Sequence, residues 1–117
     1  MTSSTITLPL SMARKSGGFV FVSGQLALRD GKIVGDDVAT QTNLAIDAIG
    51  RRLESFGLTL QNVVKTGVWL TSADDFLSFN AAYASRFSEP YPARSTVISG
   101  LALAGALVEI DAIAALS

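Results

Sequence analysis

The sequence predicts an α+β domain in which a mixed β-sheet is backed by two helices on one face. Three observations lead to this fold class: short apolar segments bounded by turn residues, two segments with helical spacing of apolar residues, and the alternation of these two kinds along the chain. The expected order is β-β-α-β-α-β-β, with a hairpin at each end. Residues 1–117 fit a single domain, because compact domains cluster around roughly 100–150 residues.

The N-terminal third is predicted to consist of strands. Residues 4–8 alternate Thr with Ile or Leu and form a weak strand candidate that ends at Pro9. Phe19–Ser23 is rich in β-branched and aromatic residues and lies between glycines, so we expect a buried strand there. Asp30-Gly31 is a tight-turn signal, and the segments on its two sides are expected to pair as a hairpin: residues 26–28 and 32–34.

Two helices are expected after this hairpin. Asp36 or Asp37 is the predicted N-cap of the first, along which apolar residues recur at helical spacing until Gly57 ends it. The second begins at Ser72–Asp75, which resembles a capping box with a short acid, and it ends before Pro90. Its aromatic residues share one side: Phe76, Phe79, Tyr83 and Phe87.

Strands are predicted at residues 63–70, 94–98 and 107–115, and the last is the most informative. Alternation places Glu109 and Asp111 together on one face of a strand that is otherwise apolar. One interpretation is an edge strand whose charged face meets water. The other is that at least one acid faces a pocket or a subunit seam, where its pKa can be tuned for proton transfer.

Arg94 is the candidate for ligand binding. It lies at the entry to a strand, directly after a proline-restricted turn, and its planar fork of donors suits bidentate binding of a carboxylate. The alternative is an ion pair with Glu109 or Asp111.

Polar residues on the other elements are weaker candidates. Gly24 permits a sharp turn or the close approach of a ligand to backbone N–H groups. Ser23 is a candidate hydrogen-bond donor rather than a nucleophile, since the chain has no histidine to activate it. Asn80 interrupts the aromatic side of the second helix, where it is either solvated or bonded to a loop, or anchors a neighbouring segment at a pocket wall.

Composition excludes several classes of function. The chain has no cysteine and no histidine, which removes disulfides, thiolate metal sites, and the commonest general base and zinc ligand. Nine basic and ten acidic residues give a net charge of −1 without a basic cluster, so no nucleic-acid partner is expected. The apolar stretch at residues 101–108 is too short to span a bilayer, and the N-terminus lacks a signal-peptide pattern. A cytoplasmic protein without a membrane partner is expected.

The low charge content favours an oligomer. Only 16% of residues are charged and 49% are hydrophobic, whereas about 25% are charged in a typical domain. A chain this apolar is expected to cover part of its surface with further copies of itself. An alanine-rich monomer is the alternative.

Several segments together resemble the RidA/YjgF family of reactive-intermediate (enamine/imine) deaminases. The most specific are P-A-R-S-T-V at 92–97 and V-E-I-D-A-I-A at 108–114, supported by F-V-S-G-Q at 21–25. Further matching segments lie at 61–66 and 79–83, and the order is kept from about Pro9 to Ala115. The resemblance implies a fold similar to that of the small trimeric chorismate mutases, and a homotrimer with clefts between subunits.

The resemblance also implies a reaction. Family members hydrolyse 2-imino or 2-enamino acids, formed by pyridoxal-phosphate enzymes, to 2-oxo acids and ammonia, and the expected site needs neither a metal nor an organic cofactor. Arg94 would bind the carboxylate of a small metabolite, and Glu109 would be the catalytic residue that orients water and moves protons. The remaining pocket residues would be Ser23, Gly24, Asn80 and Thr96.

One segment departs from the family pattern. The usual Pro-Tyr-Ser near the N-terminus is Pro9-Leu10-Ser11 here, so a tyrosine hydroxyl that commonly lines the pocket is absent. This change predicts a more apolar substrate or an altered activity. It also favours the alternative function, a non-catalytic trimer that binds or senses small 2-oxo acids. A ribonuclease activity, sometimes attributed to the family, is disfavoured by the missing histidines and basic patch.

Overall fold

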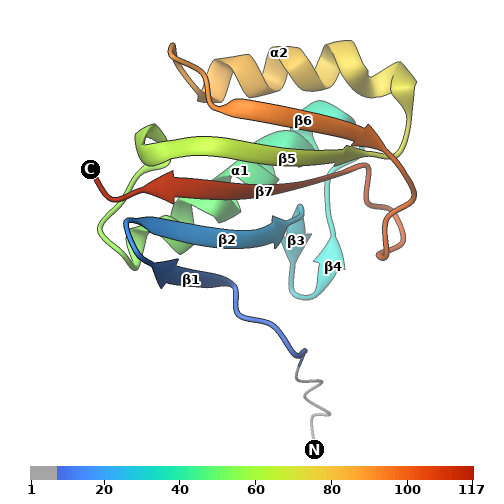
Figure 1. The fold of residues 1–117 in the computed structure, drawn as a ribbon. Coiled ribbons are helices and arrows are strands. Elements are labelled where there is room, and N and C mark those ends of the chain that lie inside the picture. The colour runs from blue at the N-terminus through green and yellow to red at the C-terminus, as the bar shows by residue number, and fades with distance from the viewer. Residues whose placement is uncertain (1–7) are drawn as a thin grey trace, which may run out of the picture.

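The computed structural model describes residues 8–117, which form a five-stranded mixed sheet with two helices packed on one face (Figure 1). The strands lie in the order β1-β2-β7-β5-β6, and a separate two-stranded ribbon precedes the first helix. The sheet strands are β1 (Ala13–Ser16), β2 (Phe19–Gln25), β5 (Val63–Leu70), β6 (Ala93–Ile98) and β7 (Val108–Ala115). The other elements are β3 (Leu28–Arg29), β4 (Lys32–Ile33), α1 (Val38–Glu54), α2 (Phe76–Arg86), and 3₁₀ turns at Leu60–Asn62 and Ala73–Asp75. The predicted fold class is confirmed.

The predicted C-terminal hairpin is wrong. β7 does not pair with β6, because β5 lies between them, antiparallel to β7 and parallel to β6. The physical reason is α2, which connects β5 to β6 as the crossover that parallel neighbours require. β7 is therefore a central strand, paired with β2 on its other side, and its interpretation as a charged edge strand is also wrong.

At the N-terminal end the structure adds a strand. Ala13–Ser16 pairs with β2 although its sequence, A-R-K-S, has no apolar alternation to reveal it. The predicted hairpin around Asp30-Gly31 is confirmed in shortened form as β3 and β4. Both turn residues have positive φ, 52° and 78°, as the turn signal implies. The strand predicted at residues 4–8 lies, apart from Leu8, outside the described residues.

The helices begin as their capping residues predict. The side chain of Asp37 accepts a hydrogen bond from the backbone N–H of Thr40 at 2.8 Å, so Asp37 is the N-cap of α1. Before α2, the Ser72 hydroxyl accepts from the N–H of Asp74 at 3.1 Å and starts the 3₁₀ turn that leads into the helix. The predicted capping box does not form. Asp75 is the last residue of the 3₁₀ turn and the N-cap of α2, and its side chain makes no capping hydrogen bond.

The core lies between the helices and one face of the sheet. α1 packs on β2 and β7 and buries Ile46, Ile49 and Leu53 completely. Each such side chain contributes about 1.5–3 kcal/mol to stability by its removal from water. Tyr83 of α2 extends this core over β5, where its hydroxyl meets that of Thr66 at 2.8 Å.

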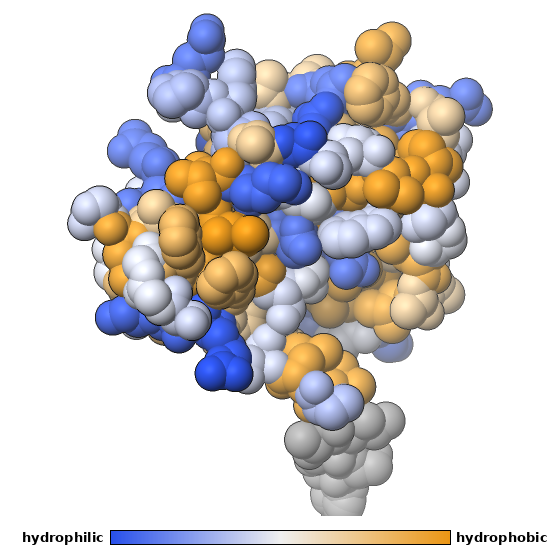
Figure 2. All heavy atoms as spheres, in the orientation of Figure 1, coloured by the Kyte–Doolittle hydropathy of each residue, from blue (hydrophilic) through white to orange (hydrophobic). Residues whose placement is uncertain are grey.

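The opposite face of the sheet carries no helix. Figure 2, which views this face, shows apolar side chains on either side of a polar area. Phe19, Phe21 and Val97 are 45%, 44% and 47% exposed. Large apolar side chains gathered on one face are typical of binding surfaces. Within residues 8–117, no helix has the length and apolar character needed to cross a membrane.

Candidate functional site

The six residues predicted to form the pocket fall into two groups on opposite faces of the sheet. In the parallel pairing of β5 with β6, Arg94 lies beside Thr66 and Thr96 beside Val68, both of which are buried under the helices. In the antiparallel pairing of β5 with β7, Glu109 lies beside Trp69, and neighbouring residues of a strand face opposite ways. Arg94, Asn80 and Thr96 therefore belong to the helix side at the β6 edge, whereas Glu109 is on the open face.

The Arg94 group surrounds a guanidinium with aromatic rings. The Cζ atom of Arg94 is 4.9 Å from the ring centroid of Tyr83, 5.1 Å from that of Phe79 and 6.0 Å from that of Phe76. Its Nη2 donates a hydrogen bond to Asn80 Oδ1 at 2.8 Å, so the Asn80 side chain is bonded to Arg94 rather than to solvent alone. Cation–π contacts and this bond hold the charge in place without neutralising it.

Arg94 has no carboxylate partner among residues 8–117, where the ion pair is Arg86 with Asp47. The alternative interpretation of Arg94, an ion pair with Glu109 or Asp111, is therefore wrong within the chain. The reason is topological, since β5 separates β6 from β7 and the side chains leave the sheet on opposite faces. Arg94 is half-buried, and its bond to Asn80 leaves further N–H donors for a negatively charged partner.

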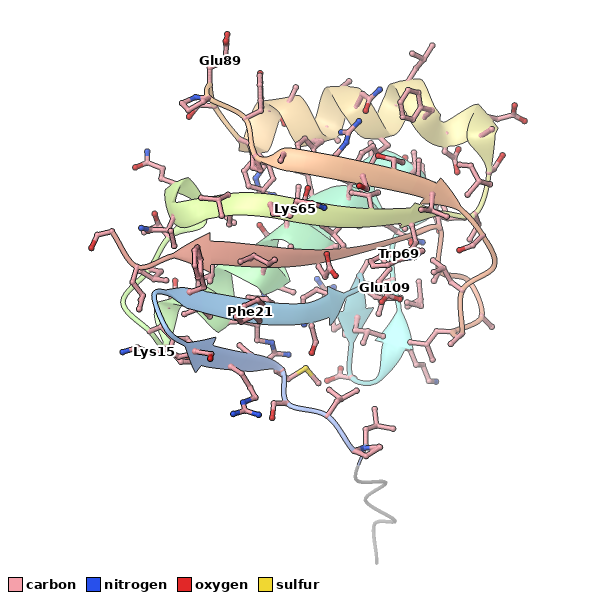
Figure 3. The ribbon with its side chains drawn as sticks, viewed as in Figure 1. Lys15, Phe21, Lys65, Trp69, Glu89 and Glu109 are labelled. Atoms are coloured by element: carbon pink, nitrogen blue, oxygen red, sulfur yellow. The ribbon has the colours of Figure 1, made fainter. Side chains whose placement is uncertain are left out.

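The Glu109 group is built on an irregularity in β2. The register of β2 against β7 shifts between Val22 and Gln25, which makes Ser23 and Gly24 a β-bulge. A Cβ atom on Gly24 would overlap the carboxylate of Glu109, so only glycine leaves room for that side chain. The bulge thus brings the backbone of β2 directly against Glu109, and Figure 3 shows this carboxylate on the face turned away from the helices.

Two further residues support this group. Gln25 is 5% exposed, and its amide donates to the carbonyl of Ser23 at 2.9 Å while accepting from Arg52 Nε at 3.2 Å. Sequence reasoning did not assign a role to Gln25, although the F-V-S-G-Q segment contained it. Asp111 accepts a hydrogen bond from the backbone N–H of Gly67 at 2.7 Å, which fixes a second carboxylate beside Glu109.

The electrostatics of Glu109 follow from this arrangement. Burial raises the pKa of its carboxyl above the ordinary value, and the like charge of Asp111 raises it further. A carboxylate that is costly to keep charged is a stronger proton acceptor than one in water. It also gains from any cation brought against it.

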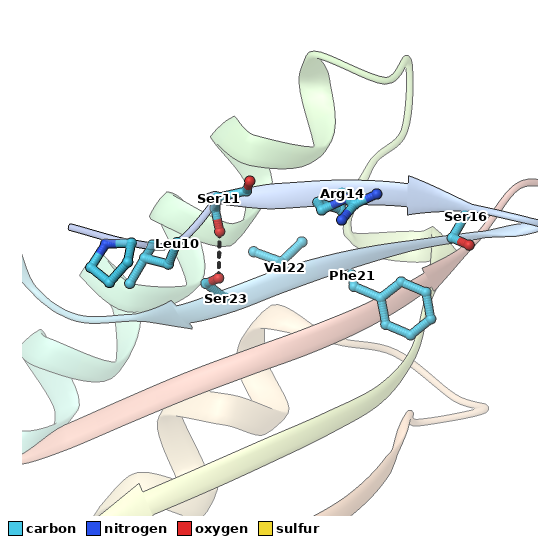
Figure 4. Close-up of a pocket in the computed structure, with 8 residues that line it drawn as sticks. Leu10, Ser11, Arg14, Ser16, Phe21, Val22 and Ser23 are labelled. Atoms are coloured by element: carbon cyan, nitrogen blue, oxygen red, sulfur yellow. Dashed lines mark hydrogen bonds between the residues drawn. The ribbon is translucent and has the colours of Figure 1, made fainter. Parts of the chain in front are cut away.

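Ser23 borders a groove on the open side of β1 and β2. Its hydroxyl donates to the carbonyl of Ser11 at 2.6 Å, which ties the segment before β1 to the bulge (Figure 4). The groove has a volume of about 790 Å³ and is lined by Pro9, Leu10, Ser11, Arg14, Ser16, Phe21, Val22 and Ser23. Leu10 thus lies where it can contact a ligand, with 52% of its surface exposed. Within the described part of the chain, no cluster of three or more acidic, His or Cys residues is placed to hold a metal ion.

The chain is similar to proteins of known sequence and of known structure that belong to one family. The family model described as Endoribonuclease L-PSP matches residues 2–116. The mitochondrial protein mmf2 of Schizosaccharomyces pombe is 40% identical over 110 residues, which make up 92% of this chain and 87% of that protein. The chloroplastic Reactive Intermediate Deaminase A of Arabidopsis thaliana is 38% identical over 92% of this chain and 59% of its own length.

Solved structures agree with these matches. RidA from the Antarctic bacterium Psychrobacter superposes with a TM-score of 0.86 at 32% identity, covering 95% of this chain and 91% of that one. The YjgF gene product of E. coli superposes with a TM-score of 0.83 at 30% identity, covering 93% and 89%. The matched range includes both residue groups described above, and the chain therefore belongs to the RidA/YjgF/L-PSP family.

Proposed function

We propose that this protein is a hydrolytic deaminase that converts reactive 2-imino or 2-enamino acids to 2-oxo acids and ammonia, in a pocket completed by two copies of the chain. The observation that carries the proposal is the separation of Arg94 and Glu109. Arg94 is a cation without an ion-pair partner in the described residues, and Glu109 is a carboxylate with a raised pKa. They lie on opposite faces of the same sheet, so one copy cannot apply both to a small substrate.

A closed homotrimer is the proposed assembly. In cyclic symmetry, each subunit presents one surface to the next subunit and a different surface to the previous one. The β6–α2 edge of one subunit, with Arg94 and Asn80, would lie against the open sheet face of its neighbour, with Ser23, Gly24 and Glu109. The exposed apolar side chains of that open face, Phe19 and Phe21 among them, would supply buried area for such an interface.

Arg94 would bind the substrate carboxylate. The guanidinium matches a carboxylate in a bidentate pair, and its bond to Asn80 leaves further N–H donors free. Thr96, two residues further along the same side of β6, would line this part of the pocket. These contacts would place the imine carbon of the substrate toward the neighbouring subunit.

Glu109 would carry out the proton transfers. It accepts a proton from water as the water oxygen bonds to the iminium carbon, and it returns that proton to the amine nitrogen. Glu109 then takes the hydroxyl proton as the carbon–nitrogen bond breaks, and this proton passes to the departing ammonia, which gives the 2-oxo acid and ammonium. The iminium carbon is already electrophilic, so positioned water and one carboxylate suffice. At the bulge the N–H of Ser23 already donates to the carbonyl of Met12 at 2.9 Å, so of these two residues Gly24 would have to supply a backbone N–H beside the reacting oxygen.

Leu10 would influence the choice of substrate. Together with Phe21 it makes part of the groove beside Ser23 apolar. A substrate with an apolar side chain larger than that of iminopropanoate fits this surface better than a polar one. The cytoplasm remains the proposed location, although mmf2 and Reactive Intermediate Deaminase A are mitochondrial and chloroplastic proteins. Fractionation of cells from the source organism tests that location.

A binding or sensing trimer for 2-oxo acids is the second candidate, and Leu10 favours it because the groove lacks the usual tyrosine hydroxyl. Glu109→Gln separates the two functions. Glutamine keeps the size of the side chain but accepts no proton at neutral pH, so turnover of imino acids generated by an amino-acid oxidase should fall about 10²–10⁴-fold. Binding of a 2-oxo acid, which depends on Arg94, should change much less. An unchanged rate in the variant would exclude Glu109 as the catalytic residue.

A further inference from the structure

We infer that Tyr83 is a positioning residue for Arg94, held in place by the hydroxyl of Thr66. The inference rests on the proposed function for its kinetic consequence, but its structural content stands on the contacts of the chain. Of the three rings around Arg94, that of Tyr83 is nearest, with its centroid 4.9 Å from Cζ. Tyr83 is 4% exposed, so its ring is a fixed part of the core rather than a mobile cover.

The orientation of the Tyr83 ring is determined from both ends. Its hydroxyl and that of Thr66 form a buried hydrogen bond of 2.8 Å, and Thr66 is fully buried in β5. The ring also packs against those of Phe79 and Phe87 in tilted arrangements, with centroid separations of 5.5 and 4.6 Å. A buried polar pair of this kind is costly to leave unmade, so the two hydroxyls specify one ring position.

This fixed ring restricts Arg94. Thr66 is also the residue beside Arg94 in the pairing of β5 with β6. The same pair of strands therefore fixes both the backbone position of Arg94 and, through Thr66, the Tyr83 ring that contacts its guanidinium. Asn80 holds one side of the guanidinium at 2.8 Å. A free arginine loses much side-chain entropy when it binds a ligand, whereas this one is ordered before binding. Burial raises the pKa of the Tyr83 phenol, which therefore stays neutral and leaves the arginine charge available.

The kinetic test compares Tyr83→Leu with Tyr83→Phe and with Ile49→Val. Leucine removes the ring, so KM for an imino acid should rise on the order of ten-fold with kcat nearly unchanged, as expected when substrate binding alone is weakened. Phenylalanine keeps the ring but not its hydroxyl bond, and KM should rise only about two-fold. Ile49→Val lowers stability at a fully buried position in α1, outside the rings and the amide that contact Arg94, and should leave KM unchanged. A KM in Tyr83→Leu equal to that of Ile49→Val would make Tyr83 merely structural.

A second measurement does not depend on the reaction. In ¹⁵N-labelled protein, the Nε–H group of Arg94, assigned by its loss in Arg94→Ala, should be ring-shifted and rigid in the wild type. It should become mobile in Tyr83→Leu. If the wild type neither turns over imino acids nor binds a 2-oxo acid while this change is seen, the proposed function fails and the positioning role stands. If the group stays equally rigid in Tyr83→Leu, the positioning role fails whatever the activity.

Discussion

The two residue groups differ in how much of their environment one chain supplies. Arg94, at the β6 edge, already has three aromatic neighbours and an amide partner within its own subunit. Glu109, in the middle of the sheet, faces outward, crowded by Gly24 and by the charge of Asp111. The first group is ordered in advance, and the second is electrostatically unfavourable until a cation or a proton reaches it. This difference supports the proposal that the two groups are halves of one site.

On the ordered side, the largest effect is expected from the loss of Arg94. Arg94→Ala should lose about 2–4 kcal/mol of transition-state binding, which corresponds to a fall in kcat/KM of roughly 30- to 1,000-fold. Arg94→Lys should recover little of it, since an ammonium cannot form the bidentate pair. Arg86→Ala is the matched control, because Arg86 already pairs with Asp47 of α1 and its loss should affect stability alone. Steady-state kinetics on both variants decides whether Arg94 serves binding.

A smaller effect is expected at the bulge. Gly24→Ala places a methyl group where the carboxylate of Glu109 lies, so Glu109 must move and the rate should fall on the order of ten- to 100-fold. Gly18→Ala adds the same methyl group where no atom lies within 4 Å and should leave the rate unchanged. Thermal unfolding of both variants shows whether the loss of activity in Gly24→Ala is greater than its loss of stability can explain. Equal rates for the two would remove the bulge from the mechanism.

The sequence predicts the features that depend on local signals and fails for those that depend on strand pairing. The strand at 63–70 and the capped helix after Asp37 follow from local signals, and the structure confirms them. Which residues lie beside Arg94 and Glu109 depends on which strands pair. The predicted pairing of the last two strands is wrong, because α2 connects β5 to β6 and makes β5, not the next strand in the sequence, the neighbour of β6. Ala13–Ser16 was missed because its pairing comes from β2 and not from its own apolar pattern. Tyr83 was assigned only to the aromatic side of its helix, since nothing local indicates its bond to Thr66.

The smallest effect concerns pH. Glu109 must be deprotonated to accept a proton, and the charge of Asp111 contributes to its raised pKa. Asp111→Asn removes that charge but keeps an oxygen for the N–H of Gly67, so the acidic limb of the rate profile should move to lower pH. A carboxyl group whose pKa is raised in the folded state stabilises the fold at pH values below its ordinary pKa. This contribution is lost as the pH rises through the pKa of the folded state. The variant should therefore gain stability at neutral pH and not in acid.

Asp74→Asn is the control for this change, since Asp74 is an exposed acid in the turn before α2. Its acidic limb should coincide with that of the wild type. Coincidence of the Asp111→Asn profile as well would show that the neighbouring charge does not tune Glu109.

Subunit complementation tests most directly whether the two groups meet across an interface. Arg94→Ala and Glu109→Gln are each expected to be inactive, and the two proteins are unfolded together in equal amounts and refolded. In a cyclic trimer with random mixing, about a quarter of the interfaces pair an intact Arg94 with an intact Glu109, so about a quarter of wild-type activity should return. Each variant refolded alone should stay inactive. If the mixture is as inactive as the separate variants, although mass spectrometry shows that the subunits have exchanged, Arg94 and Glu109 do not form one site between subunits.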